Sequence, residues 1–266
     1  MLGFGGILTL LRPQRAKPVP DQPSQGLVLR EMPVVTYAVG DVHGCHSLYR
    51  QLEDKLVEDG RRMDGRKLIV LLGDVVDRGP DSARLIDHLT STPPDGFERI
   101  CLLGNHEDMM LRFFENPAKH AVWLDFGGRE TLASYGIRPD PDHGWNIDAR
   151  RMRLVMQTHI PVEHIRFLQS LPLYVSVGDY LLVHGGVDPN KPLENQTKDD
   201  LIWTRLTSTS ETSPVGKIVV HGHTPVETAS QIGWRVATDT GACFSGRLSA
   251  AKLTSTHPAS FLTASH

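Results

Sequence analysis

The stretch Leu71-Leu72-Gly73-Asp74-Val75-Val76-Asp77-Arg78-Gly79-Pro80 places two carboxylates and a guanidinium directly after an apolar run. The run from residue 68 to 72 predicts a buried strand that stops at a glycine. Burial of Asp74 and Asp77 beside a strand end costs free energy unless cations or hydrogen bonds compensate. Arg78 could neutralise one carboxylate, and a bound metal would account for both. Alternatively, the stretch is a polar strand-to-helix loop in which Asp77 caps the next helix, so the rest of the chain has to decide.

The composition of the 266-residue chain fits one large domain or two small ones. Hydrophobic residues make up 39% of the chain and aromatic residues only 6%, so we expect a mostly aliphatic core. The net charge of −3 speaks against nucleic acid or an anionic membrane as a partner. The three cysteines are far apart and form no CxxC pair, which favours a reducing, cytoplasmic location.

Residues 1–32 are predicted to be a flexible extension that precedes a domain of residues 33–266. The apolar run from Leu2 to Leu11 is too short to cross a bilayer. No basic residue precedes it and no small-residue cleavage site follows, so it is a poor signal peptide, and we expect no stable membrane insertion. Residues 12–25 are rich in Pro, Gln, Arg and Lys, which is typical of a linker. Alternatively, residues 3–11 dock on the domain or on a membrane surface.

One pattern occurs three times between residues 34 and 107: an apolar strand ends at a glycine and polar residues, and a helix pattern follows. We expect these strands near 34–39, 68–72 and 99–103. The strand ends read Gly40-Asp41-Val42-His43-Gly44, the stretch quoted above, and Gly104-Asn105-His106-Glu107. Open α/β sheets bind ligands at the carboxyl ends of their strands, so this edge of the sheet is the predicted site.

The middle of the chain is predicted to be a helical insertion of about 108–171 that could form a cap over the site. Its helices are expected near 107–115, 118–134, 149–157 and 162–170. The second half returns to strands, expected near 173–177, 180–183, 217–220, 231–238 and 247–253. Two of these strands end in His184-Gly185-Gly186 and in His221-Gly222-His223-Thr224-Pro225.

Five strand ends therefore carry polar side chains between glycines, which allow the backbone to approach a ligand closely. Carboxylate, imidazole and amide oxygen ligands together suit a pair of divalent first-row metals, whereas the lack of thiolates disfavours a structural zinc site. A single turn of this kind says little, but five on consecutive short strands are a specific signal.

The order GDVHG, GDVVDRG, GNHE, HGG and GHTP resembles the phosphoprotein phosphatase family within the calcineurin-like metallophosphoesterases, and most of all its bacterial and phage branch. The resemblance covers residues 35–253. It implies an α/β fold with a central two-sheet β-sandwich flanked by helices. It also implies two divalent metal ions as cofactors, with manganese favoured and iron or zinc compatible with the same ligands.

The resemblance also assigns roles to individual residues. It implies that the metal ligands are Asp41 and His43 at the first metal, Asp74 between both metals, and Asn105, His184 and His223 at the second. A hydroxide shared by the two metals would attack phosphorus in line. The family pattern makes His106 the general acid, Asp77 the residue that orients it, and Arg78 the phosphate-binding arginine. Arg205, in Leu201-Ile202-Trp203-Thr204-Arg205, is the choice for a second arginine.

Four further residues near these motifs are open to more than one interpretation. His221 could be a ligand in place of His223, but the family pattern favours His223. Cys45 is expected to be a small buried thiol rather than a nucleophile. Glu107 is expected to support the start of its helix, and Asp239, beside Thr240-Gly241, to be a turn residue.

The predicted activity is that of a metal-dependent phosphomonoesterase, namely a serine/threonine protein phosphatase that could also accept phosphotyrosine. Its partner would be a phosphorylated protein or peptide. The alternative enzyme is a symmetrical bis(5'-nucleosyl)-tetraphosphatase. Asp77 favours the protein phosphatase, because a poor alkoxide leaving group needs an oriented acid more than a polyphosphate does. A binding module without activity is disfavoured because no ligand position is missing, and a nuclease because the core has no basic stretch.

Overall fold

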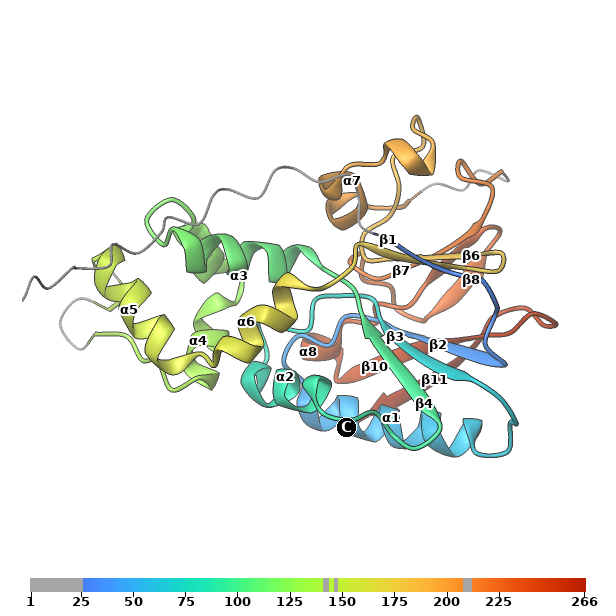
Figure 1. Cartoon of the computed structure of the whole chain (residues 1–266), viewed down its shortest axis with the longest axis horizontal. Helices are drawn as coiled ribbons and strands as arrows, with labels where there is room; N and C mark the ends of the chain where they lie inside the picture. Colours follow the sequence, from blue (N-terminus) through green and yellow to red (C-terminus); the bar gives the residue numbers. More distant parts are fainter. Residues whose placement is uncertain (1–25, 141–143, 146–147, 208–211) are drawn as a thin grey trace, which may run out of the picture.

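The computed structural model describes residues 26–140, 144–145, 148–207 and 212–266, and these form two packed β-sheets with helices around them (Figure 1). The six-stranded sheet has the order β1-β5-β6-β7-β9-β8. Its strands are β1 (Gly26–Leu29), β5 (Tyr174–Val177), β6 (Tyr180–Val183), β7 (Ile218–His221), β8 (Ser230–Ile232) and β9 (Arg235–Ala237). The five-stranded sheet has the order β11-β10-β2-β3-β4. Its strands are β2 (Val35–Val39), β3 (Lys67–Leu71), β4 (Phe97–Cys101), β10 (Arg247–Leu253) and β11 (Ser260–Ser265).

Central strands such as β2, β3 and β6 are apolar on both faces because both sides of the sheet are covered there. In β3, Leu68 and Val70 point into the core between the two sheets, whereas Ile69 and Leu71 pack against the helices. Side chains alternate along a strand, so one run of five residues serves both layers. The six-stranded sheet shows the same alternation, with β6 contributing to the core between the sheets and to a third cluster on its outer face.

The helices cover the outer face of each sheet and extend to one side. Below the five-stranded sheet in Figure 1 lie α1 (His46–Gly60) and α2 (Ser82–Thr90), and above the six-stranded sheet lies α7 (Lys198–Trp203). The central helices lie beside the two sheets, on the left in Figure 1. They are α3 (Asn105–Glu115), the 3-10 helix η1 (Ala121–Phe126), α4 (Gly128–Ser134), α5 (Ala149–His159) and α6 (Val162–Gln169). Two shorter elements, η2 (Leu193–Asn195) and α8 (Ala242–Ser245), complete the list. Within the described ranges, no helix is long and apolar enough to cross a membrane.

This architecture confirms the predicted two-sheet α/β sandwich and most of its elements, and it differs in four places. Residues 26–29, predicted to be part of the flexible extension, form β1, because this segment pairs in parallel with β5. Residues 1–25 of that extension lie outside the described residues. The strand predicted near 231–238 is a hairpin of β8 and β9. Strand β11 was not predicted.

The helix predicted over 118–134 is two helices, because the chain turns at Gly127. This glycine has a φ of 108°, and its carbonyl accepts a hydrogen bond from the backbone N–H of Arg78 at 3.2 Å. A Cβ atom there would lie 2.5 Å from that nitrogen, so only glycine fits. The hydrogen bond between Gly127 and Arg78 therefore connects the helical insertion to the turn that follows β3.

Candidate metal centre

The polar residues of the five motifs lie at one edge of the two sheets. Strands β2, β3 and β4 are parallel neighbours, and so are β6, β7 and β9, so their carboxyl ends come together. The register pairs Val39 with Leu71 and Leu71 with Cys101, which places the three turns that follow side by side.

The backbone at this edge is strained at functional positions. In the described part of the chain, the non-glycine residues with positive φ are all predicted site residues: His43, Asp74, Asp77, Arg78 and His223. Such conformations cost roughly 1–3 kcal/mol each and persist where the surroundings hold them. Their coincidence with the motifs marks this edge as a functional site.

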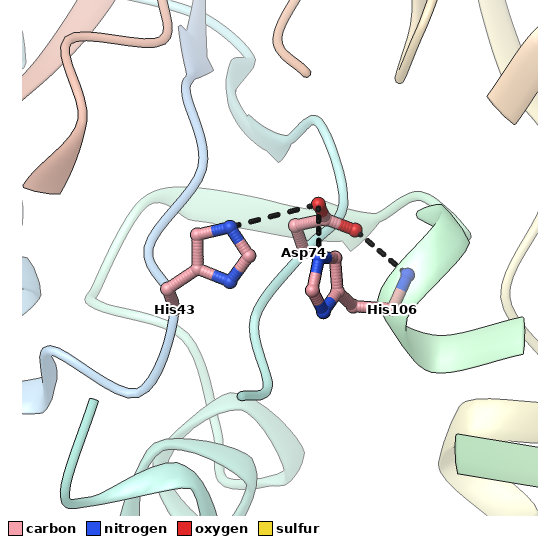
Figure 2. A group of neighbouring side chains, drawn as sticks. All are labelled: His43, Asp74 and His106. Carbon is pink, nitrogen blue, oxygen red and sulfur yellow. Dashed lines mark hydrogen bonds and ion pairs between the residues drawn. The ribbon is translucent and has the colours of Figure 1, made fainter. Parts of the chain in front are cut away.

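Two groups of side chains could each hold a metal ion, and Asp74 belongs to both. The first contains His43 and His106, whose Nε2 atoms lie 3.7 and 3.8 Å from Asp74 Oδ2. Figure 2 shows both imidazoles turned toward this carboxylate. The second group contains His184 and His223, with His184 Nε2 3.4 Å from Asp74 Oδ1. A carboxylate between two groups is the arrangement expected of a bridging ligand.

The other two predicted ligands adjoin these groups. Asn105 Oδ1 lies 2.9 Å from His184 Nε2, so the amide oxygen and the imidazole converge on one point. Both carboxylate oxygens of Asp41 accept a hydrogen bond from the backbone N–H of His223 at 3.1 Å. Gly222 permits this contact, since a Cβ atom there would lie 2.1 Å from Asp41 Oδ1.

Two of the three predicted histidine ligands have their Nδ1 hydrogen-bonded to a backbone carbonyl. His43 Nδ1–H donates to Val76 O at 2.9 Å, and His184 Nδ1–H donates to Leu72 O at 2.9 Å. His223 also forms a hydrogen bond with the backbone of Trp203. A neutral imidazole protonated at Nδ1 offers the lone pair of Nε2, so the two Nδ1 bonds fix the tautomer that a metal requires.

The carboxylates of the site lack sufficient positive charge nearby. Burial raises the pKa of Asp41 well above its usual range, and the charges of Asp239 and Asp74 raise it further. Burial and the nearby Glu107 likewise raise the pKa of Asp74. Cations bound between these carboxylates would relieve both effects. The donor set and its charge therefore fit a pair of divalent metal ions.

Glu107 supports its helix, as the sequence predicts, and it also fixes the turn that carries Asp74. Its Oε2 accepts hydrogen bonds from the backbone N–H groups of Gly104 and Asp74 at 2.9 and 2.8 Å. Its Oε1 accepts from those of Val75 and Val76 at 2.8 and 3.1 Å. One buried carboxylate thus holds two of the strand-end turns together.

Asp77 and His106 form a buried pair. His106 Nδ1 lies 2.7 Å from Asp77 Oδ2, which also accepts a hydrogen bond from Trp123 Nε1–H at 2.7 Å. Thr131 Oγ1–H donates to Asp77 Oδ1 at 2.7 Å. Burial raises the pKa of Asp77 to about 8 in opposition to these donors. Trp123 and Thr131 come from η1 and α4, and no motif in the sequence pointed to them.

The guanidinium of Arg78 lies between the metal ligands and the predicted acid. It donates one hydrogen bond to His43 Nε2 at 2.8 Å and another to His106 Nε2 at 2.9 Å. Burial and the charge of Arg78 lower the pKa of His106 to about 3, so in this arrangement His106 is neutral. A guanidinium fork can bind two oxygens of an anion such as phosphate, and the role of Arg78 as the phosphate-binding arginine stays a prediction.

Four residues with less certain assignments lie around this centre. Burial and the charge of Arg205 lower the pKa of His223 to about 4, so the guanidinium of Arg205 lies near that imidazole. Its role as a second phosphate-binding arginine stays a prediction. His221 is buried, belongs to neither metal-binding group, and donates its Nδ1–H to Gly222 O. Burial raises the pKa of Cys45 to about 11, which suits an inert thiol. Asp239 is a turn residue that accepts from Gly241 N–H, but its carboxyl group also contacts that of Asp41.

The comparisons with known proteins agree with this site. The family model of calcineurin-like phosphoesterases matches residues 35–246. A relative from Geobacillus thermodenitrificans, named bis(5'-nucleosyl)-tetraphosphatase PrpE [asymmetrical], is 30% identical over 235 residues, which cover 80% of this chain and 87% of the relative.

Two solved structures share the fold. One is provisionally described as a diadenosine tetraphosphatase (TM-score 0.60, 19% identity, 91% of this chain and 98% of that one). The other is a protein serine/threonine phosphatase from Saccharomyces cerevisiae (TM-score 0.55, 17% identity, 92% of this chain and 84% of that one). The strand-end motifs, the two metal-binding groups and the matched family model lead to one conclusion: the chain belongs to the calcineurin-like phosphoesterases and is a metallophosphoesterase.

Proposed function

We propose that the chain is a serine/threonine protein phosphatase that hydrolyses phosphomonoesters with the help of two divalent metal ions. The observation that supports this proposal is the Asp77–His106 pair, which is buried and joined at 2.7 Å. A seryl or threonyl alkoxide is a poor leaving group, so its departure depends on a proton donated in the transition state. Asp77 on Nδ1 orients the imidazole, and once the charge of Arg78 is engaged by a phosphate, an ionised Asp77 would stabilise the protonated form that donates from Nε2.

The other side chains have complementary tasks. Arg78 would exchange its hydrogen bonds to His43 and His106 for bonds to phosphate oxygens, which would free His106 Nε2 for the leaving group. Asp41, His43, Asp74, Asn105, His184 and His223 would hold the metals. When bound, two such ions lower the pKa of a water molecule and neutralise charge on the phosphoryl group. We favour manganese, with iron or zinc as alternatives, and a reducing cytoplasm, which suits the free cysteines.

A second candidate is hydrolysis of dinucleoside tetraphosphates, and it has a specific observation in its favour. The Geobacillus relative, 30% identical, carries the name of an asymmetrical bis(5'-nucleosyl)-tetraphosphatase. The sequence alone had suggested the symmetrical enzyme as the alternative. We rank this activity second because a phosphate or nucleotide leaving group needs less protonation than an alkoxide.

One assay separates the two candidates. Purified protein with manganese, iron or zinc is offered a phosphothreonine peptide or diadenosine tetraphosphate, and kcat/KM is measured for each. Preference for the peptide supports the protein phosphatase, and preference for the dinucleotide would replace it with the second candidate.

The acid role of His106 is tested by His106→Asn. We expect kcat for the phosphothreonine peptide to fall about 10²–10⁴-fold, because an alkoxide needs the proton. For p-nitrophenyl phosphate the loss should be much smaller, because nitrophenolate leaves without a proton. His106 also belongs to the first group that could hold a metal, so metal content is measured on the same samples, and the acid role predicts that it is unchanged. Equal losses on both substrates would contradict the role of His106 as general acid.

A further inference from the structure

A pocket of about 710 Å³ opens beside Arg78. It is lined by Arg78, Leu124, Asp125, Phe126, Gly127, Arg129, Glu130, Pro225 and Phe244. These residues come from the turn after β3, the junction of η1 and α4, the turn after β7, and α8. Two of the lining residues connect the pocket to the proposed phosphate site. Arg78 is the predicted phosphate-binding arginine, and Pro225 lies two residues beyond the predicted metal ligand His223.

The position of Arg78 determines what this pocket can hold. Its guanidinium donates hydrogen bonds to His43 and His106, and Arg78 also lines the pocket. Its guanidinium carbon also lies 5.6 Å from the ring centre of Phe244, a cation–π contact. A substrate whose phosphate binds to Arg78 would therefore extend its neighbouring groups into the pocket.

The lining of the pocket is apolar at its walls. Leu124 and Pro225 contribute aliphatic surface, and two aromatic side chains are unusually exposed: Phe126 at 45% and Phe244 at 75%. Large exposed aromatic side chains that gather at one concave place favour a binding role over chance.

The pocket is lined by two arginines and two acidic residues, so its formal net charge is zero. Arg129 forms an ion pair with Asp125, so these two charges compensate each other. Glu130 is exposed, and no cation pairs with it in the described part of the chain. Apart from Arg78, which the phosphate would neutralise, the pocket thus has one uncompensated negative charge. This charge repels a polyphosphate chain and attracts a basic side chain.

On these grounds, and resting on the proposed protein phosphatase function, we propose that the pocket binds the residues next to the phosphorylated residue of a peptide substrate. Its apolar walls select an apolar neighbour, and Glu130 selects a neighbour with a basic side chain. The structure thus assigns Phe126 and Glu130 as residues that determine substrate specificity.

The test compares phosphothreonine peptides that are identical except for flanking residues, which are Arg in one peptide and Glu in the other. Because the leaving group is the same, the ratio of the two kcat/KM values reports recognition of the flanks alone. We expect the natural protein to favour the basic peptide by about tenfold, and Glu130→Lys to remove or reverse this preference. The matched control is Glu163→Lys, an exposed acidic residue in the first turn of α6 that lies outside the pocket. It should leave the ratio unchanged.

Phe126→Ala supplies an independent readout with peptides flanked by Leu or Ser. We expect it to reduce the preference for the Leu peptide several-fold. If both ratios stay as in the natural protein, the pocket assignment is wrong, although the phosphatase function stands. If no phosphopeptide is hydrolysed while diadenosine tetraphosphate is, the proposed function and the pocket assignment both fail.

Discussion

At the scale of single residues, the proposed acid catalysis depends on how firmly Asp77 is held. The carboxylate of Asp77 contacts the side chains of His106, Trp123 and Thr131. The ring of Trp123 also packs against Phe113, with the ring centres 4.9 Å apart. Trp123→Phe removes the Nε1–H donor and keeps most of the ring. We expect kcat for a phosphothreonine peptide to fall about fivefold to tenfold, because one buried hydrogen bond contributes about 1–1.5 kcal/mol. Steady-state kinetics of the purified variant measures this loss.

The matched control for this residue is Trp145→Phe, at a half-buried tryptophan that lines a different pocket. It should leave kcat unchanged. Since Trp123 acts only on the acid pair, its substitution should also spare metal content and reduce p-nitrophenyl phosphate turnover less. A Trp123→Phe variant with natural kcat, or one that loses its metals, would contradict the idea that this indole positions Asp77.

At the scale of elements, a buried ion pair ties α1 to β4 and α2. Arg99, on β4, donates to Glu53 Oε1 at 3.0 Å and to carbonyls at the end of α2, and its side chain is only 2% exposed. Glu53→Ala would leave that guanidinium buried without a counter-ion. We expect a loss of about 3–5 kcal/mol in the free energy of unfolding, measured by urea titration. The control is Glu98→Ala on the same strand, because Glu98 is exposed and forms an ion pair with Arg66 at the surface. It should lower the free energy of unfolding by less than about 1 kcal/mol.

The same cluster predicts how stability depends on pH. Burial would raise the pKa of Glu53, but the hydrogen bonds and charges of His88, Tyr49 and Arg99 outweigh it, so the pKa lies below its usual value. A group of this kind stabilises the fold above its unfolded pKa, and the stabilisation disappears as the pH falls through the folded pKa. The unfolding free energies of the natural protein and of Glu53→Ala are therefore compared between neutral pH and about pH 4. The difference between them should shrink only at the acidic end of this range. A difference that is constant over this whole range would contradict the assignment.

At the scale of the whole molecule, the sequence predicted what depends on local pattern. Asp41, Asp74 and Asn105 each follow an apolar strand and a glycine, and parallel strands bring such ends together, so the edge that carries the site was predictable. Trp123 and Thr131 were not, because their contact with Asp77 depends on how the insertion packs. Strand β1 was missed because its apolar run of four residues is short and follows a Pro- and Gln-rich segment, and its pairing with β5 at the sheet edge depends on the tertiary fold. The carboxyl contact of Asp239 with Asp41 was missed because the sequence around Asp239 indicates only a turn.

The whole fold is also the scale at which metal binding should be visible, because the ligands come from both sheets. A ligand that binds only the folded state at one hundred times its Kd stabilises that state by about 2.7 kcal/mol. In a domain of this size, 1 kcal/mol corresponds to roughly 2–4 °C, so manganese should raise the Tm by roughly 5–11 °C and a chelator should reverse the shift.

Asp74→Asn removes the carboxylate shared by both groups, and His184→Ala removes an imidazole of the second, so each should abolish turnover and most of the shift. His257→Ala, at an exposed histidine far along the chain, is the control that should keep it. The shift, rather than the Tm itself, is the quantity to compare, because neutralising the buried Asp74 also changes the stability of the metal-free protein. An undiminished shift in Asp74→Asn would mean that the metal binds elsewhere.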